Sequence, residues 1–523
     1  MMVLVVISGF SNILLSQYPN VRVSSPLSND PEEVTIAINP VNAMNLAAGA
    51  NLRYYYYSTD GGFTWTEGLL TSTYGVWGDP CVVFDAHGDL FYAHLSYPPP
   101  PGYWIDRIVV QKSTNGGQSW SAGAGIGYNP PKNQDKEWLA IDFTNSRYRN
   151  YIYASWTEFD SYGSSNPLDS SRILFSRSTD GGSTWSTGVR LGDRAGDCID
   201  SDNTVEGAVP AVGANGEIYV SWAGPLGIML DKSTDRGQSF GADRFVISQP
   251  GGWDFDVSGI YRANGLPVTA CDASNSPYRG NVYVQWSDQR NGVSNTDIFF
   301  IKSTDGGQTW GQEKRVNDDA TARHQFFSWM TVDQSNGNIY VVFYDRRNTA
   351  GNATDVYVAR STDGGDSFAN FLVSSTSFTP TASVFFGDYT NIAAMDQKVY
   401  PIWMRMDGTS LSVWTAILTD STTGIAESQE RVYSFRLGQN FPNPFNPSTT
   451  IPFDVPSGVG GARQVRLDVF DVLGRLLETI INEPKAPGRY SAGFDGSKYA
   501  SGLYAYRLIV GNNYEVKRML LVK

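Results

Sequence analysis

The hydrophobic positions of this chain fall into short runs that recur in pairs. In each pair an apolar run is followed by a small turn and by a second run rich in aromatic residues, as at 81–84 with 90–92, 209–212 with 218–222 and 330–332 with 339–343. Runs of this length between Gly, Asp and Asn turns are typical of β-strands. The pattern predicts an all-β protein built from repeated hairpins, and no segment of it predicts a helix convincingly.

A fixed eight-residue phrase follows these hairpins and marks a tight turn. Its first copy reads Ser-Thr-Asp-Gly-Gly-Phe-Thr-Trp over Ser58–Trp65. Gly61 and Gly62 suit the positive φ angles of such a turn, and the Asp60 carboxylate can accept hydrogen bonds from nearby backbone amides. Asn115 replaces the aspartate in the second copy, and Arg236 replaces the first glycine in the fourth. The six copies begin at Ser58, Ser113, Ser178, Ser233, Ser303 and Ser361.

The phrase resembles the Asp-box, or BNR repeat, of sialidase-like propeller proteins, whose pattern is Ser-x-Asp-x-Gly-x-Thr/Ser-Trp. The resemblance implies a β-propeller in which the boxes are structural turns on the face opposite the functional loops, so the box aspartates are not expected to carry chemistry. These aspartates are Asp60, Asp180, Asp235, Asp305 and Asp363.

The spacing of the boxes indicates the number of blades. Successive boxes lie 55, 65, 55, 70 and 58 residues apart, which leaves room for one four-stranded blade and its loops each time. A seventh copy of the hairpin pattern, at 391–394 and 399–403 followed by 411–415, has no box. We therefore predict a seven-bladed propeller, with six blades as the alternative because sialidases with Asp-boxes have six.

The last blade lacks an outermost strand, and the amino-terminal end of the chain offers one. Val21–Ser25 reads like the strands that follow the boxes, such as Phe371–Ser375. We predict that it pairs with the last blade, because closing the ring in this way leaves no open sheet edges. The predicted divisions are an export-signal remnant at 1–16, the propeller at 17–425, a linker at 426–432 and a second domain at 433–523.

The second domain has its own pattern, with alternating apolar residues between Gly and Pro turns. This predicts a small antiparallel, Ig-like β-sandwich. The phrases at 439–451, 465–475, 501–508 and 517–523 resemble the type A carboxy-terminal sorting domain of proteins exported by the type IX secretion system of Bacteroidota and their relatives. The resemblance implies a secreted or surface-attached protein whose partner is the outer-membrane secretion machinery. An ordinary Ig-like adhesion module is the alternative.

Composition narrows the range of partners. With Lys+Arg 39 against Asp+Glu 52 the net charge is −13, which argues against nucleic acid and anionic membranes as partners. The apolar run Val3–Phe10 is too short to span a bilayer, and no other segment is a transmembrane candidate. Of the three cysteines, Cys81 is expected in the core, whereas Cys198 and Cys271 are either a disulfide pair or free thiols.

Projecting the repeats onto a propeller gathers charged residues on one face, which we call the entrance face. It holds the loops that enter the innermost strands and the loops that leave the second strands. The first group of loops supplies Glu33, Asp79, Glu137, Glu206 and Asp388; the second supplies Glu158, Asp288, Arg290, Tyr344, Asp345, Arg346, Arg347 and Arg405.

Two interpretations of this face stay open. Asp288 with Arg290, and Asp345 with Arg346 or Arg347, are either ion pairs that pin loops or parts of a glycan pocket in which arginines bind a carboxylate and paired carboxylates act as acid and base. The candidate catalytic residues are Asp79, Glu206, Asp288, Tyr344 and Asp345. The candidate ligand-binding residues are Glu33, Glu137, Arg290, Arg346, Asp388 and Arg405.

A strict sialidase is not expected. The resemblance would require an arginine triad, here Arg290, Arg346 and Arg405, with Tyr344 as the nucleophile. The Arg-Ile-Pro phrase expected near the first blade is missing, because Glu33–Ile36 stands in its place. The sequence therefore favours a glycan-binding protein, with hydrolysis by a glycoside hydrolase mechanism left open. The alternative is a non-enzymatic scaffold or adhesion propeller that binds another protein.

One loop has the composition of a calcium site. Asp197, Asp200 and Asp202 place hard oxygen ligands close together in sequence, as calcium prefers. A solvated acidic loop is the alternative. The three histidines are far apart in sequence, so neither a zinc site nor a Ser-His-Asp triad is expected.

Overall fold

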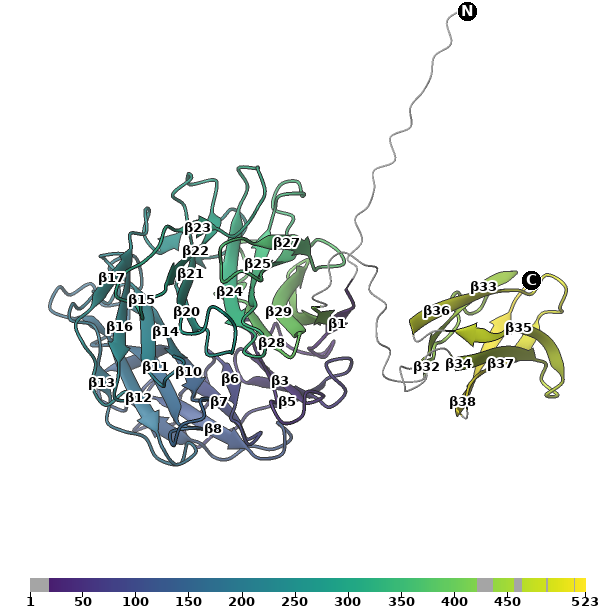
Figure 1. Ribbon diagram of the computed structural model, residues 1–523, viewed down its shortest axis with the longest axis horizontal. Coiled ribbons are helices and arrows are strands. Elements are labelled where there is room, and N and C mark those ends of the chain that lie inside the picture. The colour runs from purple at the N-terminus through teal and green to yellow at the C-terminus, as the bar shows by residue number, and fades with distance from the viewer. Residues whose placement is uncertain (1–17, 421–435, 456–462, 486–487, 512) are drawn as a thin grey trace, which may run out of the picture. The chain divides into compact units, whose positions relative to one another are not determined.

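A computed structural model describes residues 18–420, 436–455, 463–485, 488–511 and 513–523. The chain divides into two compact units, Met1–Asp420 and Ser421–Lys523 (Figure 1). The export-signal remnant predicted at 1–16 and the linker predicted at 426–432 lie outside the described residues. The described residues form strands and turns but no helix, and so contain no helix that could cross a membrane.

Antiparallel sheets of four strands make up most of the first unit. In each sheet the strands follow chain order, because every strand is joined to the next by a hairpin. In the first three sheets these strands are β2 (Thr35–Ile38), β3 (Leu46–Ala50), β4 (Tyr54–Ser58) and β5 (Thr66–Leu69); β6 (Cys81–Phe84), β7 (Leu90–Leu95), β8 (Ile108–Ser113) and β9 (Ala124–Ile126); β10 (Asn133–Ile141), β11 (Ile152–Phe159), β12 (Ser171–Ser178) and β13 (Val189–Arg190).

Three further sheets repeat this order. Their strands are β14 (Glu206–Val212), β15 (Ile218–Ala223), β16 (Ile228–Ser233) and β17 (Arg244–Ile247); β20 (Val268–Cys271), β21 (Val282–Asp288), β22 (Asp297–Ser303) and β23 (Lys314–Arg315); β24 (Gln325–Val332), β25 (Ile339–Asp345), β26 (Asp355–Ser361) and β27 (Ala369–Leu372). A separate hairpin of β18 (Asp254–Phe255) and β19 (Ala263–Asn264) is inserted between β17 and β20.

The last sheet of this unit joins the two ends of the array. It consists of β28 (Asn391–Met395), β29 (Lys398–Asp407), β30 (Ser410–Ala416), β31 (Leu418–Thr419) and the amino-terminal strand β1 (Asn20–Arg22). β1 pairs antiparallel with β30, with Asn20 opposite Ala416 and Arg22 opposite Trp414. The predicted pairing of an amino-terminal strand with the final hairpin is therefore present: β30 lies between β1 and β29 in this sheet, and Figure 1 shows the purple β1 in the same part of the unit as the green β29.

The first strands of the sheets contact one another in sequence order. β2 contacts β6, β6 contacts β10, and the contacts continue through β14, β20, β24 and β28 back to β2. The sheets thus surround a common centre, as propeller blades do. A tryptophan near the end of the second strand is fully buried in several sheets, at Trp156, Trp222, Trp286 and Trp403. These large side chains fill the space between neighbouring sheets.

The repeated turns hold themselves together. In the first, the Ser58 hydroxyl donates to Asp60 and accepts from the Gly62 amide, while the amide and hydroxyl of Thr64 both donate to the Asp60 carboxylate. The other copies with an aspartate repeat these contacts. In the second copy the Asn115 amide oxygen accepts from the Ser113 hydroxyl and the Ser119 amide, while its amide nitrogen donates to the Ser119 hydroxyl. The aspartate or asparagine of each copy is bound within its own turn, and each turn joins the third and fourth strands, opposite the entrance face.

The cysteines correct one expectation. All three are buried free thiols, so the disulfide considered between Cys198 and Cys271 does not form. The two residues belong to different environments: Cys271 ends β20, whereas Cys198 lies in the loop before β14.

The second unit consists of two antiparallel sheets that share a core. One contains β32 (Arg436–Leu437), β33 (Ser448–Val455) and β36 (Gly488–Asp495); the other contains β34 (Arg463–Phe470), β35 (Leu476–Lys485), β37 (Gly502–Val510) and β38 (Asn513–Leu521). Their inward residues, among them Ile451, Leu467, Phe494 and Leu508, form one hydrophobic cluster. The alternation of apolar residues in the sequence produces this arrangement, since it gives each strand one buried face.

The contacts of the Asp-box turns predict how they respond to substitution. Asp60→Ala removes the acceptor for Ser58 and Thr64 and should lower the free energy of unfolding by about 1–2 kcal/mol. Asp60→Asn should cost less than half as much, because an amide oxygen serves the same donors in the second copy at Asn115. Thermal unfolding measures both, with the exposed Asp366→Ala as the control. Equal losses for the two Asp60 variants would contradict this account of the turn.

Candidate functional site

The entrances of the innermost strands share an unusual backbone conformation. The equivalent positions are Glu33, Asp79, Lys136, Gly207, Phe327 and Gly387, with φ angles of 51°, 50°, 51°, 71°, 47° and 84°. At three of these positions, in β10, β14 and β24, a β-bulge shifts the register of pairing with the next strand. An L-residue in this left-handed region costs roughly 1–2 kcal/mol, which glycine avoids. The bulges turn the side chains of the flanking residues towards the centre of the unit.

Lys136 is the central cation of this arrangement. Its Nζ lies 2.7 Å from the Asp388 carboxylate, 3.5 Å from Glu33 and 3.6 Å from Asp79. Each of the three carboxylates comes from the entrance of a different sheet, and all three are buried. The structure thus brings together the predicted residues Glu33, Asp79 and Asp388. The lysine itself was missed, since the sequence pattern drew attention to the adjacent Glu137.

A second cation reaches the centre from the inserted hairpin. The Arg262 guanidinium is paired with Asp388, with its Nε 2.8 Å from Oδ1, and its NH1 lies 3.7 Å from Asp200. Asn264 of the same hairpin donates to the backbone oxygen of Asp388 at 2.9 Å, and the Tyr162 hydroxyl donates to Asp200 at 2.5 Å. The hairpin has no counterpart in the other repeats, so the repeat pattern could not have placed Arg262 here.

Burial and mutual proximity shift the proton affinities of these groups. Burial raises the pKa of Glu33 well above its ordinary value; the Lys136 ammonium opposes this shift, and Asp79 adds to it, also through a hydrogen bond between the two carboxyl groups. Burial, followed by the nearby Asp200, likewise raises the pKa of Glu206. Burial acts in the same sense on Asp388, but Lys136 and Arg262 outweigh it and hold its pKa well below the usual range.

Glu137 differs from these paired groups in its contacts. It is 2% exposed, and neither carboxyl oxygen has a hydrogen-bond partner among the described residues. Burial, with the neighbouring Asp79 as the next cause, raises its pKa well above the ordinary value. A buried carboxyl without partners is costly unless it is protonated or meets a ligand.

Glu137 lines a small pocket at the centre of the entrance face. The pocket has about 50 Å³ of room, and its walls include Asp79, Lys136 and Asp388. Three half-buried aromatic residues form another wall: the ring centroids of Trp138 and Trp329 are 4.2 Å apart, and Tyr389 lies 5.8 Å from the first and 5.9 Å from the second. An aromatic wall with few polar groups is the usual composition of a small-ligand site.

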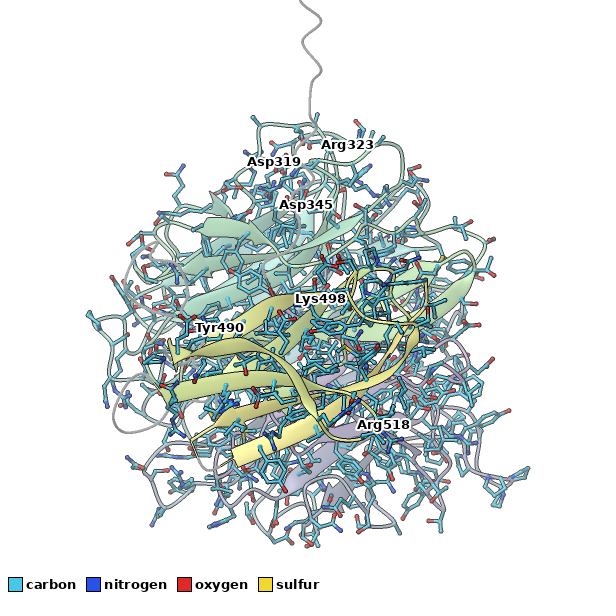
Figure 2. All side chains as sticks on the ribbon, turned by 90° about the vertical axis from the view of Figure 1, so that its right-hand side faces the viewer. Asp319, Arg323, Asp345, Tyr490, Lys498 and Arg518 are labelled. Atoms are coloured by element: carbon cyan, nitrogen blue, oxygen red, sulfur yellow. The ribbon has the colours of Figure 1, made fainter. Side chains whose placement is uncertain are left out.

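Two predicted carboxylates are held in ion pairs away from this pocket. Asp288 accepts from Arg290 at 2.6 Å and from the Trp286 indole at 2.9 Å. Asp345 accepts from Arg347 at 2.7 Å, and Arg347 also approaches Asp319. Figure 2 labels Asp319 and Asp345, which lie near one another in the view. The pairs foreseen as loop supports are therefore present, with Arg347 rather than Arg346 as the partner of Asp345.

The residues of the sialidase-like triad do not come together in the pocket. The Arg346 guanidinium is buried, with Nε bound to Thr354 and NH1 to the Ser258 carbonyl. Arg405 pairs with Asp407, and Arg290 with Asp288 and Glu313. Tyr344 is fully buried in the core, where its hydroxyl donates to the Met404 carbonyl at 2.8 Å. None of these side chains is among the described residues that line the pocket.

The acidic loop at 193–203 is organised by internal contacts. Asp197 accepts from the Thr204 hydroxyl, Asp200 from Tyr162, and Asp202 from the Asp254 amide. Among the residues that the structure describes, no three His, Cys, Asp or Glu side chains converge on a common point for a metal. The predicted calcium ligands Asp197, Asp200 and Asp202 therefore do not form one site; only Asp200 reaches the centre of the entrance face.

Residues 439–523 match the family model of the secretion system C-terminal sorting domain. This domain indicates secretion to the cell surface or the extracellular space, and thus an interaction with a secretion machinery. No curated protein matches the chain.

Solved structures that resemble the chain are propellers of the sialidase and BNR type. The NanB sialidase from Streptococcus pneumoniae is 9% identical, with a TM-score of 0.42 over 72% of this chain and 83% of that one. An α-L-arabinofuranosidase of Fusarium graminearum, solved with arabinobiose, is 12% identical, with a TM-score of 0.42 over 65% and 92%. YCF48 bound to D1 peptide is 14% identical, with a TM-score of 0.38 over 78% and 99%. Similarity at this level concerns the fold alone.

The ion pairs of Lys136 predict a pH-dependent cost for its removal. Lys136→Gln leaves the carboxylates of Glu33, Asp79 and Asp388 without their shared cation and should lower the free energy of unfolding by about 3–5 kcal/mol at pH 7.5. Without the ammonium, the folded-state pKa of Glu33 rises further, so the folded state binds more protons than the unfolded state above about pH 4.5. The loss should therefore be smaller at pH 5.

Thermal and denaturant unfolding at both pH values measure this difference. Lys112→Gln is the matched control, because Lys112 pairs with Asp89 at 2.7 Å on the surface and should contribute less than about 1 kcal/mol. Equal losses for the two variants at pH 7.5, or a larger loss for Lys136→Gln at pH 5, would contradict the central role of this ammonium.

Proposed function

We propose that this chain is a secreted, seven-bladed, sialidase-like propeller that binds glycans at the mouth of its central pocket and hydrolyses a glycosidic bond there. The closed series of contacts from β2 to β28 and back supports seven blades. The match at 439–523 supports export by a type IX system of the Bacteroidota and relatives, followed by release or attachment to the outer surface. In this proposal the propeller spans 17–425 and the sorting domain 433–523.

One observation carries the glycan proposal: an aromatic wall and an unpartnered buried carboxyl line the same pocket. The faces of Trp138, Trp329 and Tyr389 offer the apolar surface on which sugar rings stack, while Glu137 and the amide of Asn264 supply groups that can bind hydroxyls. The ring-to-ring contacts hold the aromatic side chains in place before a ligand arrives, which lowers the cost of binding.

The same pocket has the groups that hydrolysis needs. Burial raises the pKa of Glu137 well above its ordinary value, which favours the protonated form that a general acid needs, and Asp79 raises it further. In the proposed reaction Glu137 donates its proton to the leaving glycosidic oxygen as the bond to the anomeric carbon breaks. A water molecule adds to that carbon and gives its proton to Asp79. Glu206 does not line the pocket and lies beside Asp200. We propose that Asp288 and Asp345 support loops through their ion pairs.

A second candidate function follows from the rim of the entrance face. Five of the loops that leave the second strands each carry an exposed apolar residue: Leu52, Tyr97, Leu168, Leu226 and Val293. Asp288 and Asp345 are already bound to arginines, so they are not free for catalysis. This rim of exposed apolar residues is typical of a scaffold or adhesion propeller that binds another protein. In that case the small central pocket is structural.

The glycan proposal is tested by incubating the full-length protein with neutral, amino and acidic oligosaccharides and measuring both binding and product release. Glu137→Gln should abolish product formation, by at least about 100-fold, while binding persists, since the side chain keeps its shape and loses no hydrogen bond. Activity should fall as pH rises through the pKa of Glu137, because the acid must be protonated. Glu313→Gln is the control, because Glu313 is exposed and does not line the pocket.

The two candidate functions give different results in this experiment. Trp329→Leu should weaken glycan binding about tenfold or more if the aromatic wall carries a sugar ring. Absence of glycan binding and turnover across the panel would overturn the glycan proposal and leave the protein-binding rim. Turnover that is unchanged in Glu137→Gln would retain the enzyme but remove its proposed acid.

A further inference from the structure

The centre of the entrance face holds many more acidic than basic groups. Two basic groups, Lys136 and Arg262, face eight linked carboxyl groups within residues 18–420: Glu32, Glu33, Asp79, Asp135, Glu137, Asp200, Glu206 and Asp388. Both basic groups are already saturated, Lys136 by three carboxylates and Arg262 by two. The centre is therefore short of positive charge.

An anionic sugar would be a poor ligand for this pocket. A sugar carboxylate is normally bound by an arginine that offers a free guanidinium edge. Arg262 presents its edge to Asp388 instead, and the arginines of the predicted triad lie elsewhere. A sugar carboxylate would also meet Asp79 and Asp388 in the pocket wall, where like charges repel strongly because little water screens them.

A cationic group is a better match for the same wall. Glu137 offers two acceptor oxygens that no described residue uses, and it lies beside the faces of Trp138, Trp329 and Tyr389. Ammonium groups bind in such surroundings through charge-assisted hydrogen bonds to carboxyl oxygens and through attraction to aromatic faces, and the nearby Asp79 and Asp388 also favour a positive charge. The chain itself shows the principle, since the Lys136 ammonium lies 5.9 Å from the centroid of the Tyr389 ring.

The size of the pocket limits how much of a ligand enters. About 50 Å³ holds a small substituent such as an amino group with its carbon, and not a whole sugar ring. The ring would then remain at the aromatic mouth, where Trp138 and Trp329 can stack against it. An N-acetyl group is larger and neutral, so it would fit less well and would leave the Glu137 carboxyl without a cationic partner.

We infer that the central pocket selects glycans that carry a free amino group, such as 2-amino-2-deoxy sugars, over their N-acetylated and carboxylated counterparts. This inference rests on the proposed function, because it names the class of glycan for the same pocket. It goes beyond glycan binding in assigning the selectivity to Glu137 and to the aromatic wall.

The inference is tested by calorimetry with the full-length protein and short oligosaccharides of matched length: glucosamine oligomers, their N-acetylated forms and galacturonate oligomers. We expect the amino form to bind at least about tenfold more tightly than the N-acetylated form, and the uronate to bind weakest. In Glu137→Gln this preference should shrink to about twofold or less, while affinity for the N-acetylated form stays the same. Glu313→Gln should keep the preference of the unmodified protein.

The outcomes separate the inference from the proposed function. If no oligosaccharide binds, the proposed function itself fails. If glycans bind but the N-acetylated or acidic forms bind as tightly as the amino form, only the inference is overturned. Because the chain has a net charge of −13, spermidine is the control for non-specific attraction: binding as tight as that of the amino sugar and unchanged in Glu137→Gln would also overturn the inference.

Discussion

The ammonium group of Lys136 is the contact on which the centre of this propeller depends. A ring of sheets brings the entrances of all its innermost strands to one small region, so any charge placed there meets the charges of every other sheet. Glu33, Asp79 and Asp388 meet in this way, and their mutual repulsion would oppose closure of the ring. Lys136 contacts all three and turns a repulsive set into a network of ion pairs.

The inserted hairpin of β18 and β19 supplies a second cation, Arg262, that balances the buried carboxylates. Through Arg262 and Asn264 it is bound to Asp388, and through Arg262 it also approaches Asp200, so one insertion links the last sheet to the loop that precedes β14. Phe255 and Ile260 of this segment pack into the same core cluster as Phe326 and Phe386. Apolar packing therefore holds the guanidinium at the centre, where its charge is required.

The two faces of the first unit differ in role: the Asp-box turns stabilise one face, and the candidate site lies on the other. On one face the Asp-box turns use their own hydroxyls and amides to satisfy each aspartate. On the other face Glu137 is buried without a partner among the described residues, and non-glycine residues adopt a backbone conformation that glycine prefers. Local strain and unsatisfied groups of this kind gather where a site is built, because the surrounding structure must hold them in place.

The sequence by itself determined the features that depend on local chemistry. The strands, the Asp-box turns, the pairing of β1 with the last hairpin and the sorting domain all follow from short patterns that repeat or stand alone. It also located the entrance face to within one residue, since Glu33, Asp79 and Asp388 were identified there. The tertiary structure decided which neighbour faces the centre: a bulge with positive φ made Lys136, and not Glu137, the partner of three carboxylates. Only the fold could bring Arg262 from an unrepeated insertion and bury Tyr344 in the core, because these outcomes depend on contacts between residues far apart in sequence.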